Sequence, residues 1–413
     1  MRILFLVNGH LRSDNYPHVN MGGSVQTWGL CKELAKKGHE VYIVRRSRNA
    51  KEEIVDRVKL IGVAFKGAEN ALPNTKFMYH VFLLLSKFYF SVKSYSIIKR
   101  INPDVLCFID RQTAIFPAIL NLPKVFIIHS PEAMDFFKAD SLRANRMHAV
   151  LFYVVKVLQD IIMRRSNCVV VLNNYMKNYL MKQKKVQVVT ISNGVDVVNF
   201  SSRKDKDFIL YAGRFDWNKN VYNLAEAFVN LEKKYPDYRL CLVGEGPEER
   251  RIKMLIAENT LQSKVTMLPW LPRAKLAEIL RDCSVFVLPS LFEVSPVVVL
   301  EAMSSSKPVI AKTNMGTVDV VVDGKTGYLY SNDEELRKYL GLLISDRQLR
   351  KTVGSNGRRL VEEKYTFGQI ANEYEKLFLR VIGVVDNFDL SFVAETNCIG
   401  IDGHSICERV SVN

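Results

Sequence analysis

Cysteine is scarce in this chain, and no hydrophobic run is long. The seven cysteines among 413 residues are scattered, odd in number and free of any C-x-x-C pair. That pattern argues against a disulfide framework and against a cysteine zinc site. The longest uncharged apolar stretch of the N-terminal half, 77–86, is about half of what a bilayer span needs. The sequence therefore predicts a reduced, cytoplasmic protein without a transmembrane span.

Acidic residues are in deficit, but only in one half of the chain. Residues 1–200 hold 29 Lys and Arg against 14 Asp and Glu, whereas residues 201–413 hold 29 of each kind. The first half therefore carries the whole formal net charge of +15. A basic half suits contact with a polyanion: nucleic acid, an anionic membrane surface or a phosphate-bearing substrate. No nucleic-acid-binding motif accompanies the charge, so we expect no nucleic-acid partner, and a solvated basic surface is the alternative.

Short β-branched runs separated by helical stretches recur along the whole chain. Seven of them lie at 3–7, 40–44, 58–63, 104–109, 124–129, 168–172 and 186–191. Six more follow at 208–213, 238–244, 264–269, 284–290, 307–312 and 326–330. Near-continuous apolar strands alternating with helices are typical of parallel sheets covered on both faces. The chain is thus predicted to be α/β, with two Rossmann-like doubly wound domains in tandem and a natural boundary in the polar stretch SSRKDKD at 201–207, which follows the turn-forming NGVD at 193–196.

The strongest motif is LPSLFEVSPVVVLEAM, 288–303. Ligands of open α/β sheets bind beyond the carboxyl ends of the strands, so two facing sheets predict a site in the cleft between the domains. We expect Ser295 to cap a helix whose first residue is Pro296. The backbone N–H groups of Val297 and Val298 then stay free at a positively polarised helix end, which suits a phosphate.

Two glutamates flank this helix start. Glu301 lies one helical turn after Val297, and its carboxylate suits the hydroxyls of a ribose better than a phosphate. Glu293, in the loop before the helix, suits the hydroxyls of a sugar. The alternative is that both glutamates are incidental neighbours of a helix start.

Two cations follow the strand at 208–213. Arg214 and Lys219, in the segment GRFDWNKN, would neutralise a diphosphate, and an arginine can bind it in bidentate fashion. Solvated loop charges are the alternative.

The N-terminal half offers a glycine pair and a histidine. Gly22 and Gly23 precede an expected helix that Gly38 closes, and they suit close approach of the backbone to a ligand. A simple turn would explain the pair as well. His129 ends the strand at 124–129 and would face the cleft, where an imidazole positions a substrate or shares a proton. Ordinary loop packing is the alternative.

Other ligand signatures are missing. The one G-x-G that follows a strand, at Gly244 and Gly246, has Glu249 in place of the third glycine, so a dinucleotide fingerprint is absent. The D-x-D at Asp205 and Asp207 precedes a strand, and solvated charges explain it better than a metal–diphosphate site. We therefore predict no metal and no cofactor.

Two stretches, 77–100 and 147–166, are basic, aromatic and amphipathic. Helices packed on a sheet are the usual explanation of such a pattern. The aromatic content and the clustered terminal cations also suit interfacial helices on anionic lipid, so peripheral contact with the inner face of a membrane is the second interpretation.

Taken in order, the motifs resemble the retaining glycosyltransferases of family 4, also called glycosyl transferases group 1, which have the GT-B fold. The resemblance spans about residues 1–380 and rests on GG…ELAKKGHEV (22–41), NGVDVVNF (193–200), GRFDWNKN (213–220), VGEGPEE (243–249), PSLFEVSPVVVLEAM (289–303) and VDGKTGYLY (322–330). The ordered set is specific, whereas no single member of it is.

The resemblance implies two domains with different ligands. Residues 1–196 would bind the acceptor, with a last helix at about 367–382 packed back onto them, and residues 197–366 would bind the nucleotide sugar. The paired cations would hold the donor diphosphate, Glu293 the donor sugar and Glu301 the ribose. The double glycine would lie near the donor phosphates, and His129 near the reacting sugar. The donor site would thus comprise Gly22, Gly23, Arg214, Lys219, Glu293, Ser295, Val297, Val298 and Glu301, with His129, Glu293, Arg214 and Lys219 as the catalytic residues.

The implied activity is transfer of a sugar, with retained anomeric configuration, from a nucleotide-diphosphate sugar to a glycan, a lipid-linked saccharide or a related acceptor. Polysaccharide or lipopolysaccharide biosynthesis is the expected setting. Prearranged cations and a helix N-terminus would stabilise the leaving diphosphate without a metal. A GT-B sugar-nucleotide epimerase or hydrolase and a catalytically silent sugar-nucleotide-binding subunit are the alternatives.

The sequence departs from the family pattern in three places. Ser306 stands where glycine is common. Residues 315–319, MGTVD, stand where the family usually has a double glycine followed by a glutamate, and this difference affects the expected contacts to the donor sugar. Ser295 and Pro296 replace a frequent Phe-Gly. Residues 383–413 match no motif, and we expect them to form a loosely ordered tail.

Overall fold

The computed structural model describes residues 1–7, 22–47, 49–64, 76–109, 115–129, 157–158, 160–184, 186–197 and 205–383. The expected tail beyond Gly383 lies outside these residues, as do 147–156 and 159 of the second basic stretch and 198–200 of the NGVDVVNF motif.

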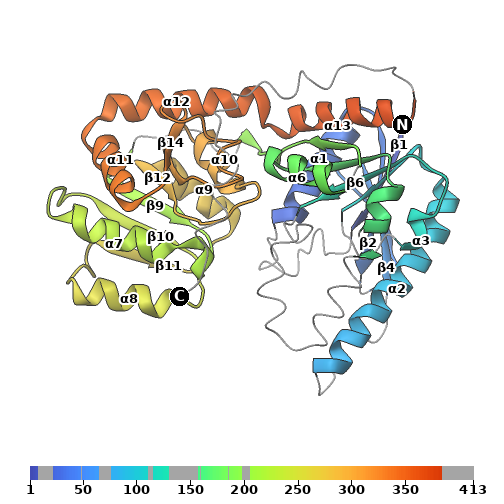
Figure 1. Ribbon diagram of the computed structural model, residues 1–413, viewed down its shortest axis with the longest axis horizontal. Coiled ribbons are helices and arrows are strands. Elements are labelled where there is room, and N and C mark those ends of the chain that lie inside the picture. The colour runs from blue at the N-terminus through green and yellow to red at the C-terminus, as the bar shows by residue number, and fades with distance from the viewer. Residues whose placement is uncertain are drawn as a thin grey trace.

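Two separate sheets form the two lobes of the molecule (Figure 1). The first contains β1 (Arg2–Val7), β2 (Glu40–Ser47), β3 (Glu52–Val55), β4 (Val58–Ala64), β5 (Val105–Phe108), β6 (Lys124–Ile128), β7 (Cys168–Val171) and β8 (Val188–Thr190), in the order β3-β4-β2-β1-β5-β6-β7-β8. The second contains β9 (Phe208–Ala212), β10 (Arg239–Val243), β11 (Val265–Leu268), β12 (Val285–Leu288), β13 (Val309–Lys312) and β14 (Gly327–Tyr330), in the order β11-β10-β9-β12-β13-β14.

Helices follow most of the strands. Those of the first lobe are α1 (Gly22–Lys36), α2 (Lys76–Ile101), α3 (Ile115–Ala118) and α6 (Asn174–Lys184). Those of the second are the 3₁₀ helix η4 (Trp217–Lys219), α7 (Val221–Glu232), α8 (Glu249–Glu258), α9 (Arg273–Asp282), α10 (Val297–Ser304), α11 (Asp333–Ser345) and α12 (Arg347–Lys364), and α13 (Phe367–Val381) ends the described chain.

The thirteen strands predicted from the sequence are all present, and the α/β fold with two doubly wound sheets is confirmed. The expectation of wholly parallel sheets is wrong at one edge, because β3 pairs with β4 in antiparallel fashion. The two strands are joined by Asp56 and Arg57, whose φ angles of 48° and 67° are those of a tight hairpin turn. The segment EEIV escaped notice because its glutamates hide a strand pattern and its turn lacks the usual Asn-Gly or Asp-Gly.

The last two helices lead from the second lobe back to the first. In Figure 1, α12 lies over the second sheet and α13 continues over the first. The buried face of α13, which includes Ile370, Tyr374 and Phe378, packs in one cluster with residues of β1, β5, β6 and α1. At the crossing point the ring of Phe367 comes so close to Gly29 of α1 that a Cβ there would lie 2.3 Å from it. The chain therefore closes back on its own first lobe through a tight contact that a side chain at Gly29 would obstruct.

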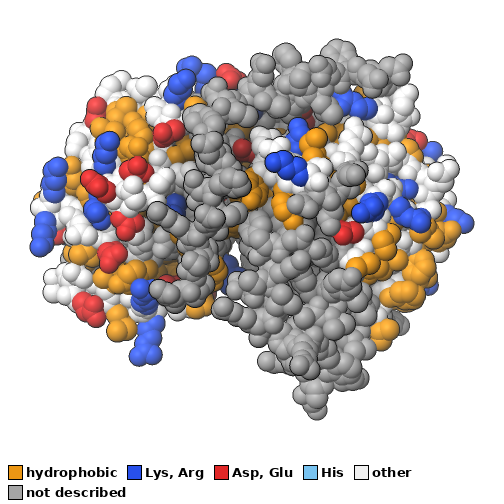
Figure 2. Space-filling view, in the orientation of Figure 1, with side chains coloured by type: hydrophobic (Ala, Val, Ile, Leu, Met, Phe, Trp, Pro, Cys, Tyr) orange, Lys and Arg blue, Asp and Glu red, His pale blue; other side chains and the backbone are white. Residues whose placement is uncertain are grey.

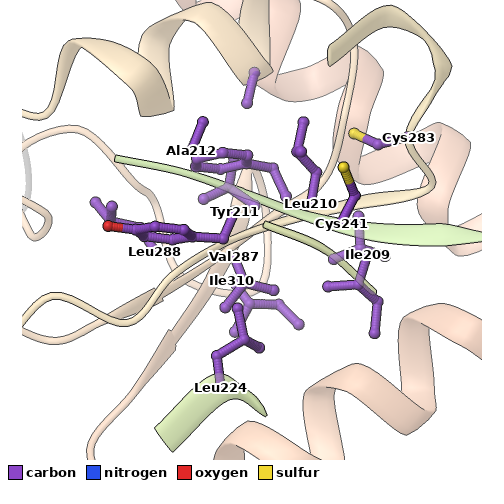
Figure 3. Packing of buried hydrophobic residues seen from close by; sticks show 14 of the residues in the cluster. Ile209, Leu210, Tyr211, Ala212, Leu224, Cys241, Cys283, Val287, Leu288 and Ile310 are labelled. Atoms are coloured by element: carbon purple, nitrogen blue, oxygen red, sulfur yellow. The ribbon is translucent and has the colours of Figure 1, made fainter. Parts of the chain in front are cut away.

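The core of the second lobe is built by side chains of β9, β10, β12, β13 and α7 (Figure 3). Tyr211 of β9 is fully buried in it, and its hydroxyl donates a hydrogen bond of 2.8 Å to the Arg214 carbonyl. The described cysteines are buried and form no disulfide. Among the described residues, we find no helix of the length and hydropathy that a membrane crossing needs.

A buried ion pair joins Asp205, shortly before β9, to Lys307, shortly before β13. The Nζ of Lys307, which is 1% exposed, lies 2.6 Å from Oδ1 of Asp205, and Nε of Arg350 lies 3.7 Å from its other oxygen. The interpretation of Asp205 as a solvated linker charge is therefore wrong. Its position in a polar segment hid a partner about a hundred residues away.

Candidate functional site

The strand order of the second sheet reverses between β9 and β12. From β9 the chain moves outward to β10 and β11, whereas β12 leads to β13 and β14 on the other side. The loops that leave two such neighbouring strands diverge and open a crevice at the carboxyl ends of the strands, which is where open α/β sheets bind ligands. These loops are 213–220 and 289–296, which carry the cations and the first glutamate predicted from the sequence.

Glycines let the loop after β9 lie against the loop after β10. The Gly213 N–H donates to the Val243 carbonyl at 2.9 Å, and the Phe215 N–H donates to the Glu245 carbonyl at the same distance. Gly244 has a φ of +140°, and a Cβ there would lie 1.8 Å from the Gly213 oxygen. The G-x-G at 244–246 therefore serves the packing of two loops.

Lys219 and Glu293, one from each of these loops, form an ion pair. The Lys219 Nζ lies 2.6 Å from Oε1 of Glu293, and both side chains are mostly buried, at 24% and 14% exposure. Asp216 holds the lysine's backbone, since its Oδ1 accepts from the Lys219 N–H at 3.1 Å. Arg214 lies on the same loop, 65% exposed, with its Nε 3.3 Å from Asp216. Both cations thus lie beside a carboxylate, but Lys219 is mostly buried whereas Arg214 is exposed.

The helix after β12 begins one residue later than predicted. α10 starts at Val297 and Pro296 is its N-cap residue, with no capping side chain, so the expectation that Ser295 caps the helix is wrong. Pro296 has a ψ of 89°, which is not helical, and its carbonyl already accepts the Val299 N–H at 3.0 Å. The N–H groups of Val297 and Val298 belong to the first turn, where no helical carbonyl precedes them. Ser295 adds a buried Oγ that has no hydrogen-bond partner among the described residues.

Glu301 lies deeper than the sequence suggests. Only 6% of the residue is exposed, and its Oε1 lies 2.7 Å from Nη2 of Arg273, the first residue of α9. Burial raises the pKa of the Glu301 carboxyl, and the neighbouring Arg273 guanidinium opposes that shift. A carboxylate held in this way keeps a second oxygen for another donor. Sequence reasoning missed Arg273, because nothing in its local sequence marks it as the partner of a residue 28 positions on.

The segment after β13 contacts the loop 289–296, which carries Glu293. Asn314 donates from Nδ2 to the Ser290 carbonyl at 2.9 Å, and its Oδ1 accepts the Gly316 N–H at 3.1 Å. A Cβ at Gly316 would lie 2.5 Å from the backbone carbonyl oxygen of Glu293. The departure from the family pattern at 315–319 thus keeps the one glycine that this close backbone approach requires.

Gly23 and His129, both predicted from the sequence, also lie close together. A Cβ on Gly23 would lie 3.8 Å from Nδ1 of His129, so the start of α1 and the end of β6 are neighbours. Gly22 is the first residue of α1. Burial lowers the pKa of His129 to about 4, so its imidazole is neutral near pH 7 and both donates and accepts hydrogen bonds. This pair belongs to the first lobe, and the cations and glutamates belong to the second.

No group of three or more His, Cys, Asp or Glu side chains that would suit a metal ion occurs in the described part of the chain. A surface pocket of about 570 Å³ lies beside α8, and neither Glu293 nor Glu301 lines it. It is lined by Gly246, Pro247, Glu249, Arg250, Lys253, Met254 and Ala257.

Two family models match consecutive parts of the chain. The model of glycosyl transferases group 1 matches residues 196–360, and the model of glycosyltransferase family 4 matches residues 21–199. The chain belongs to the family 4, group 1 glycosyltransferases, as its ordered motifs predicted.

Two relatives are about one quarter identical to this chain over the aligned residues. A glycosyltransferase of Haemophilus influenzae is 27% identical over 358 residues, which are 84% of this chain and 93% of that protein. The capsular polysaccharide biosynthesis glycosyltransferase CapM of Staphylococcus aureus is 24% identical over 282 residues, which are 61% of this chain and 71% of CapM.

Solved structures confirm the predicted GT-B fold. Sucrose-phosphate synthase from Thermosynechococcus elongatus aligns with a TM-score of 0.74 at 20% identity, over 93% of this chain and 100% of that chain. HepE of Anabaena, solved in complex with UDP and glucose, aligns with a TM-score of 0.65 at 15% identity, over 92% and 100%.

Proposed function

We propose that this glycosyltransferase moves a sugar from a nucleotide-diphosphate sugar to a glycan, a lipid-linked saccharide or a related acceptor, with retained anomeric configuration. The observation that carries the proposal is the Lys219–Glu293 pair at the point where the second sheet reverses its strand order, next to the start of α10. The cation suits the diphosphate of a nucleotide sugar, and the carboxylate suits the hydroxyls of its sugar. The N–H groups at the helix start suit the phosphate oxygens.

The second lobe binds the donor in this proposal. Lys219 and the exposed Arg214 contact the diphosphate, and the first-turn N–H groups of α10 with the Ser295 hydroxyl donate to its oxygens. Negative charge accumulates on the diphosphate as the glycosidic bond breaks. Cations and dipoles that are already in place stabilise that charge without reorganisation.

The two glutamates bind hydroxyls of the donor. Glu293 accepts hydrogen bonds from the sugar, beside the lysine that contacts the diphosphate. Glu301 accepts from the ribose through the oxygen that Arg273 leaves available. Each glutamate has a cation within 3 Å, Lys219 beside Glu293 and Arg273 beside Glu301.

The first lobe presents the acceptor. Gly22 and Gly23 approach the donor phosphates, and the neutral His129 forms a hydrogen bond near the reacting sugar. We assign no carboxylate as a nucleophile, and retention follows from front-side attack: an acceptor hydroxyl forms the new C–O bond on the face from which the diphosphate leaves, and its proton passes to the departing diphosphate. No metal and no cofactor takes part in this proposal.

The relatives support a setting in cell-surface polysaccharide biosynthesis. CapM is named for capsular polysaccharide biosynthesis, and the fold neighbour WaaG for lipopolysaccharide biosynthesis. TarM, another fold neighbour, was solved with UDP and α-GlcNAc-glycerol, which supports a nucleotide-sugar donor and a glycosylated acceptor.

Release of nucleoside diphosphate with and without candidate acceptors tests the proposal. We expect release that depends on an acceptor and continues in EDTA. Release without acceptor indicates the epimerase or hydrolase, and tight binding of nucleotide sugars without turnover indicates a catalytically silent subunit. Loss of turnover in EDTA, restored by a divalent cation, contradicts metal independence.

We further propose that α2 places the first lobe on an anionic membrane. Leu85, Phe88, Tyr89 and Val92 follow helical spacing, and each is more than a third exposed, so they form one outward apolar stripe. Lys93, Lys99 and Arg100 follow them. Figure 2 shows hydrophobic side chains gathered beside Lys and Arg on the side of the molecule where α2 lies. An apolar stripe with adjoining cations suits an anionic interface.

Charge reversal on α2 is expected to release the protein from anionic vesicles. Changing Lys93 and Lys99 to Glu should reduce partition onto phosphatidylserine vesicles about tenfold or more, at roughly 1 kcal/mol per cation near the surface. The matched control reverses Arg250 and Lys253 on α8 and should change little. Sedimentation with vesicles at two salt concentrations measures the effect. Equal binding by both variants would remove the membrane proposal.

A further inference from the structure

The start of α6, in the first lobe, contacts the loop 289–296 of the second lobe. Asn173 is fully buried just before this helix. Its Oδ1 accepts the Met176 N–H at 2.8 Å, so it caps α6. Its Nδ2 donates a hydrogen bond of 2.8 Å to the carbonyl of Val294. One side chain therefore closes a helix in one lobe and holds the backbone of the other.

A second hydrogen bond joins the same places. The Asn174 N–H donates to Oδ2 of Asp319 at 2.6 Å, and the Asp319 carbonyl accepts from the Tyr365 hydroxyl at 3.0 Å. A carboxylate at a helix N-terminus is favourably placed against the helix dipole. Asp319 thus ties the segment after β13 to α6 independently of Asn173.

The two tied segments are the walls of the candidate donor site. Val294 lies between Glu293 and Ser295 in the chain, and Gly316 presses its backbone against the Glu293 carbonyl. Phe292, Val294 and Met315 pack against the apolar cluster of the first lobe that includes Met176. The backbone on both sides of Glu293 is therefore contacted by residues of both lobes.

We propose that Asn173 is a positioning residue for the donor sugar: by holding the Val294 carbonyl, it fixes Glu293 toward the sugar whenever the two lobes are in contact. This inference rests on the proposed function, in which Glu293 binds the donor sugar. The diphosphate is held by Lys219, Arg214 and the start of α10, which Asn173 does not touch. Asn173 therefore matters for the intact nucleotide sugar and not for the nucleoside diphosphate.

Capping and positioning are separable by substitution. Serine and aspartate cap helices about as well as asparagine, so Asn173→Ser and Asn173→Asp keep an acceptor for the Met176 N–H. Neither keeps the N–H group that reaches Val294, and the aspartate sets an oxygen against the carbonyl oxygen. The matched control is Asn332→Ser, because Asn332 caps α11 through the Glu335 N–H at 3.0 Å and lies outside the donor loops.

The probe pair comes from a thermal-shift screen of UDP-, GDP- and ADP-sugars: the nucleotide sugar that raises Tm most, and its own nucleoside diphosphate. We expect Asn173→Ser to weaken affinity for the nucleotide sugar about 5- to 10-fold, the effect of one lost hydrogen bond, and Asn173→Asp to weaken it more. Affinity for the nucleoside diphosphate should stay within about twofold of wild type. Asn332→Ser should leave both affinities at their wild-type values.

Two outcomes overturn the inference: unchanged affinity for the nucleotide sugar, or equal weakening for both ligands. Glu293→Gln, measured alongside, separates this failure from failure of the proposed function. If Glu293→Gln leaves nucleotide-sugar affinity unchanged, or if no nucleotide sugar raises Tm, the donor site is misassigned. If Glu293→Gln weakens that affinity and Asn173→Ser does not, the site stands and Asn173 only caps α6.

Discussion

Replacing Lys219 with methionine is expected to lower kcat/KM for the nucleotide sugar about 100- to 1000-fold, the usual effect of removing one prearranged group that stabilises transition-state charge. The second lobe fixes Lys219 through Asp216 at its backbone and Glu293 at its Nζ. Its loss leaves the leaving diphosphate with the exposed Arg214 and the helix end alone. Steady-state kinetics with the preferred donor measures the effect.

The control for this variant is Lys253→Met, because Lys253 is an exposed cation of α8 that pairs with Glu249. It should change kcat/KM less than about twofold. Lys219→Arg keeps the charge and should recover part of the lost rate. Full turnover by Lys219→Met would show that the lysine is only a counter-ion of Glu293.

Changing Asp205 to Asn is expected to destabilise the second lobe by about 3–5 kcal/mol, since it removes the carboxylate from a buried ion pair. For a domain of this size, that corresponds to a decrease in Tm of about 6–20 °C. Lys307 is 1% exposed and lies 2.6 Å from Asp205, so solvent cannot replace the lost carboxylate. Thermal or urea unfolding, followed by circular dichroism, gives the difference.

A double substitution sharpens this prediction. Replacing a buried ion pair by apolar residues is often neutral, so adding Lys307→Met to Asp205→Asn should recover much of the loss. The control pair is Lys206 with Asp282, where the lysine is 69% exposed; Asp282→Asn should cost under about 1 kcal/mol. Equal costs for Asp205→Asn and Asp282→Asn would contradict a structural role for the buried pair.

The fold was predictable because its signal is local. Each β-branched run needs only its neighbours to be identified as a buried strand, and the helices between such runs determine a parallel sheet. β3 escaped because a short edge strand with two glutamates lacks that signal. Asp205 was misinterpreted for the opposite reason: its own segment is polar, and its partner Lys307 lies in another segment.

The candidate site was predictable as a region and not as a set of contacts. The order of strands and loops placed Lys219 and Glu293 at the same sheet edge, but 74 residues separate them and nothing local announces their ion pair. Arg273 and Asn173 escaped entirely. Their importance comes from residues that they meet across helices or lobes, whereas sequence periodicity reports only which face of an element is buried.

A crystal structure of the protein with its preferred nucleotide sugar would locate the donor directly. The proposed donor site requires the diphosphate within hydrogen-bond distance of Lys219 and of the first N–H groups of α10, with the sugar at Glu293. A nucleotide sugar bound instead in the pocket beside α8, against Arg250 and Met254, would contradict it.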